Sequence, residues 1–127
     1  MKLLLDANAL LWWFEGGQLL PRRGRVAIEG PDNEVFVSVA AVWELAIKTG
    51  LGKLDARALL DGAEERFSKA GFGTLVITLE HAIRAEALPG HHRDPFDRML
   101  IAQAQAENLT VVSSNRIFDH YGVRRVW

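Results

Sequence analysis

The sequence predicts an α/β fold, in which a parallel sheet of about five strands lies between two layers of helices. Three observations support this fold class. The chain has 127 residues, of which 49% are hydrophobic and 24% charged, which suits a single domain spanning residues 1–127. Short apolar runs alternate with segments of helical periodicity, as expected for parallel strands joined by helical crossovers. The apolar runs are continuous, as in strands that are covered on both faces.

The strands are expected at five of these runs. They lie at residues 3–5, 35–37, 75–77, 111–112 with their neighbours, and 123–127. Each is bounded by polar residues or turn formers, and each is short enough for a strand at the centre of a small sheet.

The first three helices are expected over residues 9–14, over residues 21–29, and from a cap at Ser38 to Lys48. Ser38 directly follows the second apolar run and carries a hydroxyl that can accept from the first turn. Glycines at positions 50 and 52 are expected to stop this third helix.

Three more helices follow, and each has a capping residue. Asp55 can cap a helix that carries Leu59 and Phe67 on one face, and Thr78 can cap residues 79–88. Asp94 followed by Pro95 is the strongest start signal, because proline suits the first helical position. That last helix is expected to continue to about residue 108.

Composition excludes several classes of site. The chain has no cysteine, which excludes disulfides, cysteine-ligated zinc and thiol nucleophiles. The net charge of −1 does not indicate a nucleic-acid binder by bulk electrostatics. The three leucines between Lys2 and Asp6 are too short an apolar run for a signal peptide. No apolar run approaches the length of about 20 residues that a membrane span needs. We therefore expect a cytoplasmic protein without a membrane segment.

Four polar residues are expected to meet at the carboxyl edge of the sheet, where sites of parallel α/β folds lie. Asp6 follows the first strand, and Glu44 lies in the helix after the second. Asp97 lies in the first turn of the helix that leads to the fourth strand, and Asn115 follows that strand.

Three carboxylates at one edge need a compensating charge. Two carboxylates about 5 Å apart repel by about 3 kcal/mol at an effective dielectric constant of about 20. Either protons or a cation must offset this repulsion. Mg²⁺ prefers carboxylate and water oxygens, and Mn²⁺ suits the same ligands. A site of this kind supports phosphodiester hydrolysis, since the ion polarises the phosphoryl oxygen and lowers the pKa of water.

Each acid also has a structural interpretation when it is considered alone. Asp6 can cap the first helix, and Glu44 can be a charge on a helix surface. Asp97 can form a capping box with Asp94. Their joint placement at one edge favours a site over three unrelated structural roles.

Four sequence blocks carry a resemblance to a known family. Residues 3–13 (LLLDANALLWW) hold the first acid, residues 38–48 (SVAAVWELAIK) the second, and residues 94–104 (DPFDRMLIAQA) the third. Residues 113–127 (SSNRIFDHYGVRRVW) form the last block. In this order, and over essentially the whole chain, they resemble the PIN-domain ribonucleases, specifically the VapC toxins of bacterial toxin–antitoxin pairs.

The resemblance implies a role for each polar residue. Asp6 and Asp97 would be the main metal ligands. Glu44 would be the third acid, which binds the metal directly or through water and orients the attacking water. Asn115 stands where family members often have a fourth acid, so it brings a hydrogen-bonding group without charge. Asp119 would be a partial substitute for that acid, but its place in the last block favours a structural role.

The resemblance also implies an activity and partners. The activity is Mg²⁺-dependent endonucleolytic cleavage of RNA, leaving a 5′-phosphate and a 3′-hydroxyl. The partners are the RNA substrate, a cognate VapB-type antitoxin, and a second copy of the chain in a homodimer.

Two groups of residues outside the acid set have open interpretations. His91, His92 and Arg93 precede the Asp94 cap and Arg98 follows Asp97, so they either hold the RNA backbone or form a solvated loop. The adjacent aromatic residues at positions 12–14 cannot all lie on one buried helical stripe. They either expose a groove for the antitoxin or wrap around the core.

Two other functions remain open. A phosphoacceptor signalling domain also uses clustered acids and Mg²⁺, but it needs an aspartate at the end of the third strand, where Thr78 follows Ile77, and a lysine after the fifth, where Arg124 and Arg125 stand. A PIN module without catalytic activity, which acts by binding a protein, is compatible with Asn115.

Overall fold

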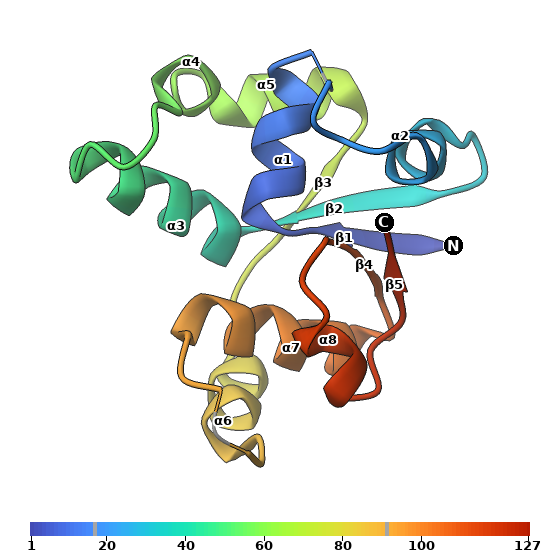
Figure 1. Cartoon of the computed structure of the whole chain (residues 1–127), viewed down its shortest axis with the longest axis vertical. Helices are drawn as coiled ribbons and strands as arrows, with labels where there is room; N and C mark the ends of the chain where they lie inside the picture. The colour runs from blue at the N-terminus through green and yellow to red at the C-terminus, as the bar shows by residue number, and fades with distance from the viewer. Residues whose placement is uncertain (17, 91) are drawn as a thin grey trace.

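The computed structural model describes residues 1–16, 18–90 and 92–127. Within these residues, five parallel strands form one sheet in the order β3-β2-β1-β4-β5 (Figure 1). The α/β class and the parallel sheet predicted from the sequence are therefore confirmed. The strands are β1 (Lys2–Leu5), β2 (Glu34–Ser38), β3 (Gly73–Leu75), β4 (Thr110–Val112) and β5 (Arg125–Val126).

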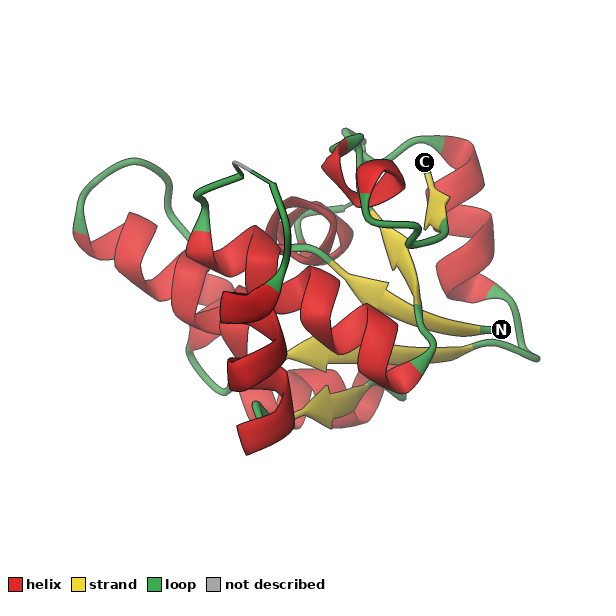
Figure 2. Ribbon diagram, turned by 90° about the horizontal axis from the view of Figure 1, so that it is seen from below, coloured by secondary structure: helices red, strands yellow, loops and turns green. Residues whose placement is uncertain are grey.

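Helices cover both faces of the sheet. In Figure 1, α1 to α5 lie on one side and α6 to α8 on the other, and Figure 2 views the sheet from the α6 to α8 side. No helix in the described ranges combines the length and the apolar character needed to span a membrane. The helices are α1 (Ala7–Phe14), α2 (Arg22–Glu29), α3 (Val39–Gly50), α4 (Arg57–Leu60), α5 (Ala63–Ala70), α6 (Leu79–Ala87), α7 (Pro95–Glu107) and α8 (Ile117–His120).

A hydrophobic core lies on each face of the sheet, which explains why the strands are continuously apolar. Leu3 and Leu5 of β1 pack into the core beneath α1 to α5. Leu4, between them, points to the other face and packs with Leu100 of α7 and Phe118 of α8. All three leucines of β1 are fully buried.

The topology fixes where polar residues can gather. β1 lies between β2 and β4. The chain leaves β1 toward β2 on one side and later reaches β4 on the other, so the winding reverses at the carboxyl end of β1. Ligands of open parallel sheets bind at such a reversal. Asp6 directly follows β1 and stands at this point.

The predicted helix caps are confirmed at four of five positions. The side chains of Asp6, Ser38, Thr78 and Asp94 each accept a hydrogen bond from a backbone N–H in the first turn of the helix that follows. These caps satisfy donors that a helix N-terminus otherwise leaves without a partner.

The prediction for Asp55 is wrong, because the segment forms two helices instead of one. α4 begins at Arg57 and ends at Leu60, and α5 begins at Ala63. Between them Gly62 takes a left-handed conformation with φ of 70°, which ends one helix and redirects the chain. Asp55 lies before the cap position and accepts from the backbone N–H of Arg57 at 3.1 Å.

The third strand is also displaced from its expected place. β3 covers residues 73–75 rather than 75–77, and Val76 is 60% exposed. The strand starts at Gly73 because the ring of Phe36 in β2 occupies the space beside it, so that a Cβ there would lie 3.0 Å from the ring. The sequence prediction places the strand after this glycine, because glycine in a sequence usually indicates the interruption of a strand.

Candidate active site

Asp6 occupies the centre of the carboxyl edge. Its Oδ1 accepts from the backbone N–H of Ala9 at 2.8 Å, and the Ser113 hydroxyl is a second hydrogen-bond partner. The pKa of Asp6 is raised to about 6, chiefly by burial and to a smaller extent by the negative charges of Asp97 and Glu44, while the two hydrogen bonds oppose the rise. The cap that sequence predicts is therefore real, and the same carboxyl group also lies within the field of both other acids.

Glu44 is a buried acid in an otherwise apolar turn of α3. The residue is 9% exposed, whereas its neighbour Trp43 is 58% exposed. Its Oε2 accepts from Nζ of Lys48, one turn later, at 2.6 Å. Burial and the effect of Glu44 on the pKa of Asp6 argue against the interpretation of Glu44 as a surface charge.

Asp97 does not form the capping box that was its structural alternative. Asp94 caps α7 by accepting from the backbone N–H groups of Phe96 and Asp97. The Asp97 carboxylate instead accepts at Oδ2 from Nε2 of His92 at 2.9 Å and from Nδ2 of Asn115 at 3.2 Å. Burial raises the pKa of Asp97, and its hydrogen bond from His92 opposes that shift.

Asn115 is oriented by two contacts at the end of β4. Its Oδ1 accepts from the backbone N–H of Ile117 at 3.0 Å, and its Nδ2 donates to Asp97. Asn115 therefore brings an uncharged hydrogen-bond donor to the acid site. Asp119 lies outside this set, because it forms a two-point ion pair with Arg125 at 3.0 and 3.1 Å that lowers the pKa of Asp119.

Sequence reasoning missed Ser113 and Lys48, and it considered His92 only as a contact for the RNA backbone or as part of a solvated loop. Ser113 is fully buried and its Oγ accepts from the backbone N–H of Asn115 at 2.9 Å. Lys48 holds Glu44, and His92 holds Asp97. The available signals were the position of Ser113 directly after β4 and the spacing of four residues between Glu44 and Lys48.

The donor set fits a hard divalent cation by its chemistry. Asp6, Glu44 and Asp97 provide carboxylate oxygens, and the internal hydrogen bonds of the described residues engage one oxygen of Glu44 and one of Asp97. As the side chains stand, no group of three or more His, Asp or Glu in the described ranges converges closely enough to hold an ion. A metal that takes the hydrogen-bonded oxygens of Glu44 and Asp97 would have to displace Lys48 from Glu44, and His92 and Asn115 from Asp97.

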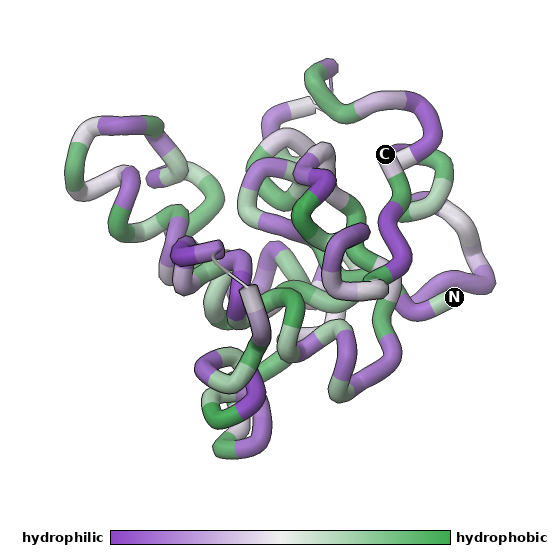
Figure 3. Tube along the Cα trace, turned by 60° about the horizontal axis from the view of Figure 1, so that its bottom comes forward, coloured by the Kyte–Doolittle hydropathy of each residue, from purple (hydrophilic) through white to green (hydrophobic). Residues whose placement is uncertain are grey.

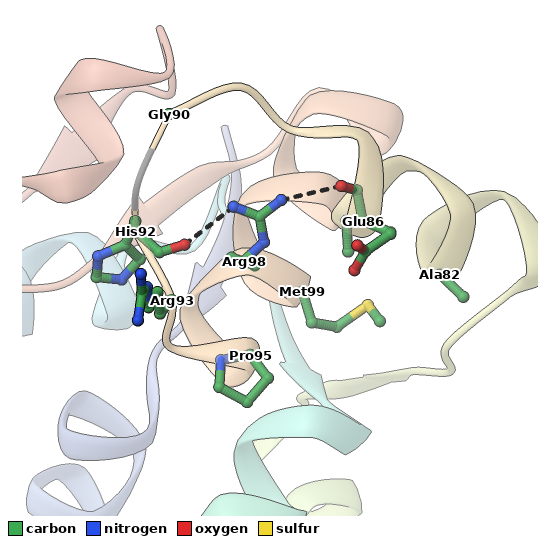
Figure 4. A pocket seen from close by; sticks show the side chains of 9 residues that line it. Ala82, Glu86, Gly90, His92, Arg93, Pro95, Arg98 and Met99 are labelled. Carbon is green, nitrogen blue, oxygen red and sulfur yellow. Dashed lines mark hydrogen bonds between the residues drawn. The ribbon is translucent and has the colours of Figure 1, made fainter.

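The loop before α7 borders a cavity next to this site. The cavity has a volume of about 510 Å³, lies between α6 and α7, and includes His92, Arg93, Arg98 and Met99 in its lining. Figure 4 shows the guanidinium of Arg98 directed at the backbone carbonyl oxygens of His92 and Glu86. Because Arg98 also donates to the carbonyl of Leu88, it fastens the loop, and the hypothesis that it contacts RNA is not favoured. Arg93 is exposed, and His91 lies outside the described residues.

The aromatic residues of α1 pack at the edge of the core. Trp12 contacts Trp127 at a ring-centroid distance of 5.7 Å, Trp13 contacts Phe72 at 6.0 Å, and Phe14 contacts the same Phe72 at 5.9 Å. All three are half-buried. These contacts favour the interpretation that the aromatic residues wrap around the core, because Trp127 and Phe72 cover the sides of α1 that one helical stripe leaves open.

Comparison with known proteins supports the fold. The sequence model of the PIN domain family matches residues 3–123. A solved structure of VapBC2 from Rickettsia felis, bound to a promoter DNA fragment, matches with a TM-score of 0.70 and 16% identity over 98% of this chain and 97% of that chain. DNA-bound VapBC from Salmonella typhimurium matches with a TM-score of 0.67 and 22% identity over 98% and 96%.

A curated relative of a different kind also matches. The 1-deoxy-D-xylulose 5-phosphate reductoisomerase of Xanthomonas euvesicatoria is 32% identical over 97 residues, which are 75% of this chain and 24% of the relative. The chain thus spans about a quarter of the length of the curated relatives it matches. Its sequence has no G-x-G-x-x-G fingerprint for a dinucleotide, so this likeness gives no basis for reductoisomerase chemistry.

Proposed function

Since the chain belongs to the PIN domain family, we propose that it is a metal-dependent endoribonuclease and the toxin component of a toxin–antitoxin pair. In this proposal residues 1–127 form one catalytic PIN domain that uses Mg²⁺ or Mn²⁺ in the cytoplasm. The observation that carries the proposal is the effect of Asp97 and Glu44 on the pKa of the buried Asp6. Three acids within one another's field at a sheet edge are costly unless a cation is bound.

The proposed roles follow from burial and contacts. Asp6 and Asp97 would hold the ion, because the pKa of each is raised, in both cases chiefly by burial. Glu44, in α3, would be the third acid and would orient the attacking water. Asn115 and His92 hold the Asp97 carboxylate in place. When bound, the divalent ion supplies polarisation of the phosphoryl oxygen and a more acidic water.

RNA cleavage tests this proposal. We expect purified protein to cut structured RNAs with Mg²⁺, to be inactive with EDTA, and to lose activity in Asp97→Asn, which removes charge with little change in shape. Cleavage that persists in EDTA or survives this substitution contradicts the proposal. A wild-type protein that folds and binds metal but cuts no RNA favours the adaptor function without catalysis. The phosphoacceptor alternative lacks an acceptor, because β3 ends at Leu75 and is followed by Val76.

We propose a VapB-type antitoxin as protein partner. The support is the likeness to chains of solved VapBC complexes. If the proposal is correct, expression of the chain alone arrests growth, and co-expression of its antitoxin restores growth and yields a complex that co-purifies. Growth arrest by the Asp97→Asn variant would show that the effect does not come from the acid site.

An exposed apolar surface supports the homodimer. Val39, Trp43, Ile47 and Leu51 recur every four residues along α3, and Leu79 and Ile83 form a similar row on α6. Ser38 of β2 pairs with Leu75 of β3. The residues that follow them, Val39 and Val76, therefore lie next to each other and connect the row on α3 with the row on α6. Figure 3 shows hydrophobic segments alternating with hydrophilic ones along the tube of these outlying helices.

The size of this surface suits a second copy of the chain. Its seven residues have exposed fractions from 37% to 73% and leave on the order of 700 Å² uncovered, near the roughly 800 Å² that each partner contributes to a standard interface. Ultracentrifugation tests the proposal: we expect a wild-type dimer and a monomeric Ile83→Glu variant. Val26→Glu, on exposed α2, is the control and should remain dimeric. A wild-type monomer at tens of micromolar contradicts this part of the proposal.

A further inference from the structure

The ion pair between Glu44 and Lys48 differs from the other helical ion pairs of the described chain. Nζ of Lys48 lies 2.6 Å from Oε2 of Glu44, and the Glu44 side chain is 12% exposed whereas that of Lys48 is 39% exposed. The pair Glu65 and Lys69 on α5 has the same spacing, but its side chains are 72% and 76% exposed. Only the pair on α3 therefore combines a buried carboxylate with an ammonium group that reaches solvent.

The Lys48 ammonium group also interacts electrostatically with the other acids of the site. Its pKa is raised, chiefly by the hydrogen bond to Glu44, and the charges of Glu44, Asp94 and Asp97 add to that effect while burial opposes it. The influence is mutual, because the charge of Lys48 lowers the pKa of Asp97. Lys48 therefore supplies positive charge to the place where the proposed function needs a divalent cation.

We propose that Lys48 is the internal counter-ion of the acid site, which holds Glu44 in the metal-free protein and competes with a divalent cation for that carboxylate. This inference rests on the proposed function. It accounts for acids that are close enough to perturb one another and yet do not converge on one point. The flexible and partly exposed stem of Lys48 allows the ammonium group to turn to solvent when the ion arrives.

Two other roles for Lys48 make different predictions. If the pair acts only as a helix-surface ion pair, like that of Glu65 and Lys69, removing the ammonium group leaves metal binding unchanged. If Lys48 orients Glu44 for the metal, removing it weakens binding. Competition predicts the opposite sign, because loss of a nearby positive charge strengthens the attraction of the acids for a divalent ion.

Titration of MnCl₂ into metal-free protein, followed by calorimetry and by thermal unfolding, distinguishes these roles without measuring activity. We expect Lys48→Met to bind Mn²⁺ roughly five- to tenfold more tightly than wild type, and to unfold at a lower temperature in EDTA. Lys48→Arg keeps the charge and should bind within about twofold of wild type. Lys69→Met is the matched control and should also bind like wild type. Lys48→Gln repeats the test if the methionine variant does not fold.

The outcomes separate this inference from the proposed function. If wild type binds Mn²⁺ and Lys48→Met binds it with the same or a weaker affinity, the inference is overturned and the proposed metal site is not. Binding by Lys48→Met where wild type shows none supports the inference. Absence of binding in both proteins overturns the inference together with the proposed metal site.

Discussion

Asn115 donates from Nδ2 to Oδ2 of Asp97 at 3.2 Å, at the position where an acid would place two carboxylates in contact. The amide gives Asp97 a partner that costs no charge repulsion. The bond to Asp97 also joins the turn after β4 to α7, and the Asn115 amide is oriented for it because its Oδ1 accepts from the backbone N–H of Ile117. A neutral residue at position 115 therefore stabilises the metal-free site.

The variant Asn115→Asp tests this interpretation. We expect it to unfold at a lower temperature than wild type in EDTA, because two carboxylates in contact repel by about 4 kcal/mol at an effective dielectric constant of about 20 before protonation relieves part of that cost. Added Mn²⁺ should stabilise the variant more than wild type. Gln18→Glu, which adds the same charge at an exposed residue, is the control. Equal metal-induced shifts in all three proteins would show that residue 115 does not belong to the site.

Asp6 makes the stability of the metal-free protein depend on pH. The pKa of Asp6 is about 6 in the folded protein against 3.8 as its ordinary value, so the folded state binds the proton more tightly than the unfolded state. Stability is therefore lost as the pH rises from about 4 to above 6, by about 3 kcal/mol in total.

The variant Asp6→Asn removes this loss and keeps the cap, because asparagine also accepts from a helix N-terminus. We expect urea unfolding in EDTA to show a more stable variant at pH 7.5 and little difference from wild type at pH 4. Asp32→Asn, in an exposed turn, is the control and should have the stability of wild type at both pH values. A variant less stable than wild type at pH 7.5 would mean that Asp6 is not strained by burial and by its acidic neighbours.

Arg93 and Arg98 have separate roles despite their shared loop. Arg98→Ala removes donors to three carbonyl oxygens, and we expect it to destabilise the fold by about 2 kcal/mol in urea. Arg93→Ala should leave stability unchanged and weaken RNA binding, with a smaller dependence on salt. RNA binding that falls in Arg98→Ala without a change in stability would reverse this assignment.

Backbone conformation explains why the segment after α3 could not be predicted in detail. Its apolar spacing correctly buries Leu59 and Phe67, but the left-handed turn at Gly62 divides the helix. A glycine within a helical pattern has the same appearance in sequence whether it continues the helix or ends it. Local signals that involve a side chain and the nearby backbone, such as the Asp94 cap followed by Pro95, were sufficient to place α7.

Glycine substitutions test this distinction directly. Gly62→Ala should destabilise the protein by about 1–2 kcal/mol, because alanine is strained at a φ of 70°. Gly50→Ala is the matched case, since Gly50 ends α3 in helical conformation with open space around it. It should stabilise the protein by about 0.5–1 kcal/mol. Chemical denaturation of both variants gives opposite signs if the left-handed turn is correct.

The candidate site was predicted to the level of its acids and not of their partners. Asp6, Glu44 and Asp97 follow from topology alone, because strand ends and helix starts meet at one edge. Lys48 and His92 could not be assigned in the same way, since a flexible side chain four or five residues from an acid has many possible orientations.

The most direct test of the shared cation is a crystal structure of the protein grown with Mn²⁺, with anomalous scattering used to locate the ion. The account predicts a strong peak within bonding distance of Asp6 and Asp97, with Glu44 released from Lys48 and turned toward the ion. An anomalous map without a peak at these residues, in crystals whose acids keep the hydrogen bonds described above, would contradict it.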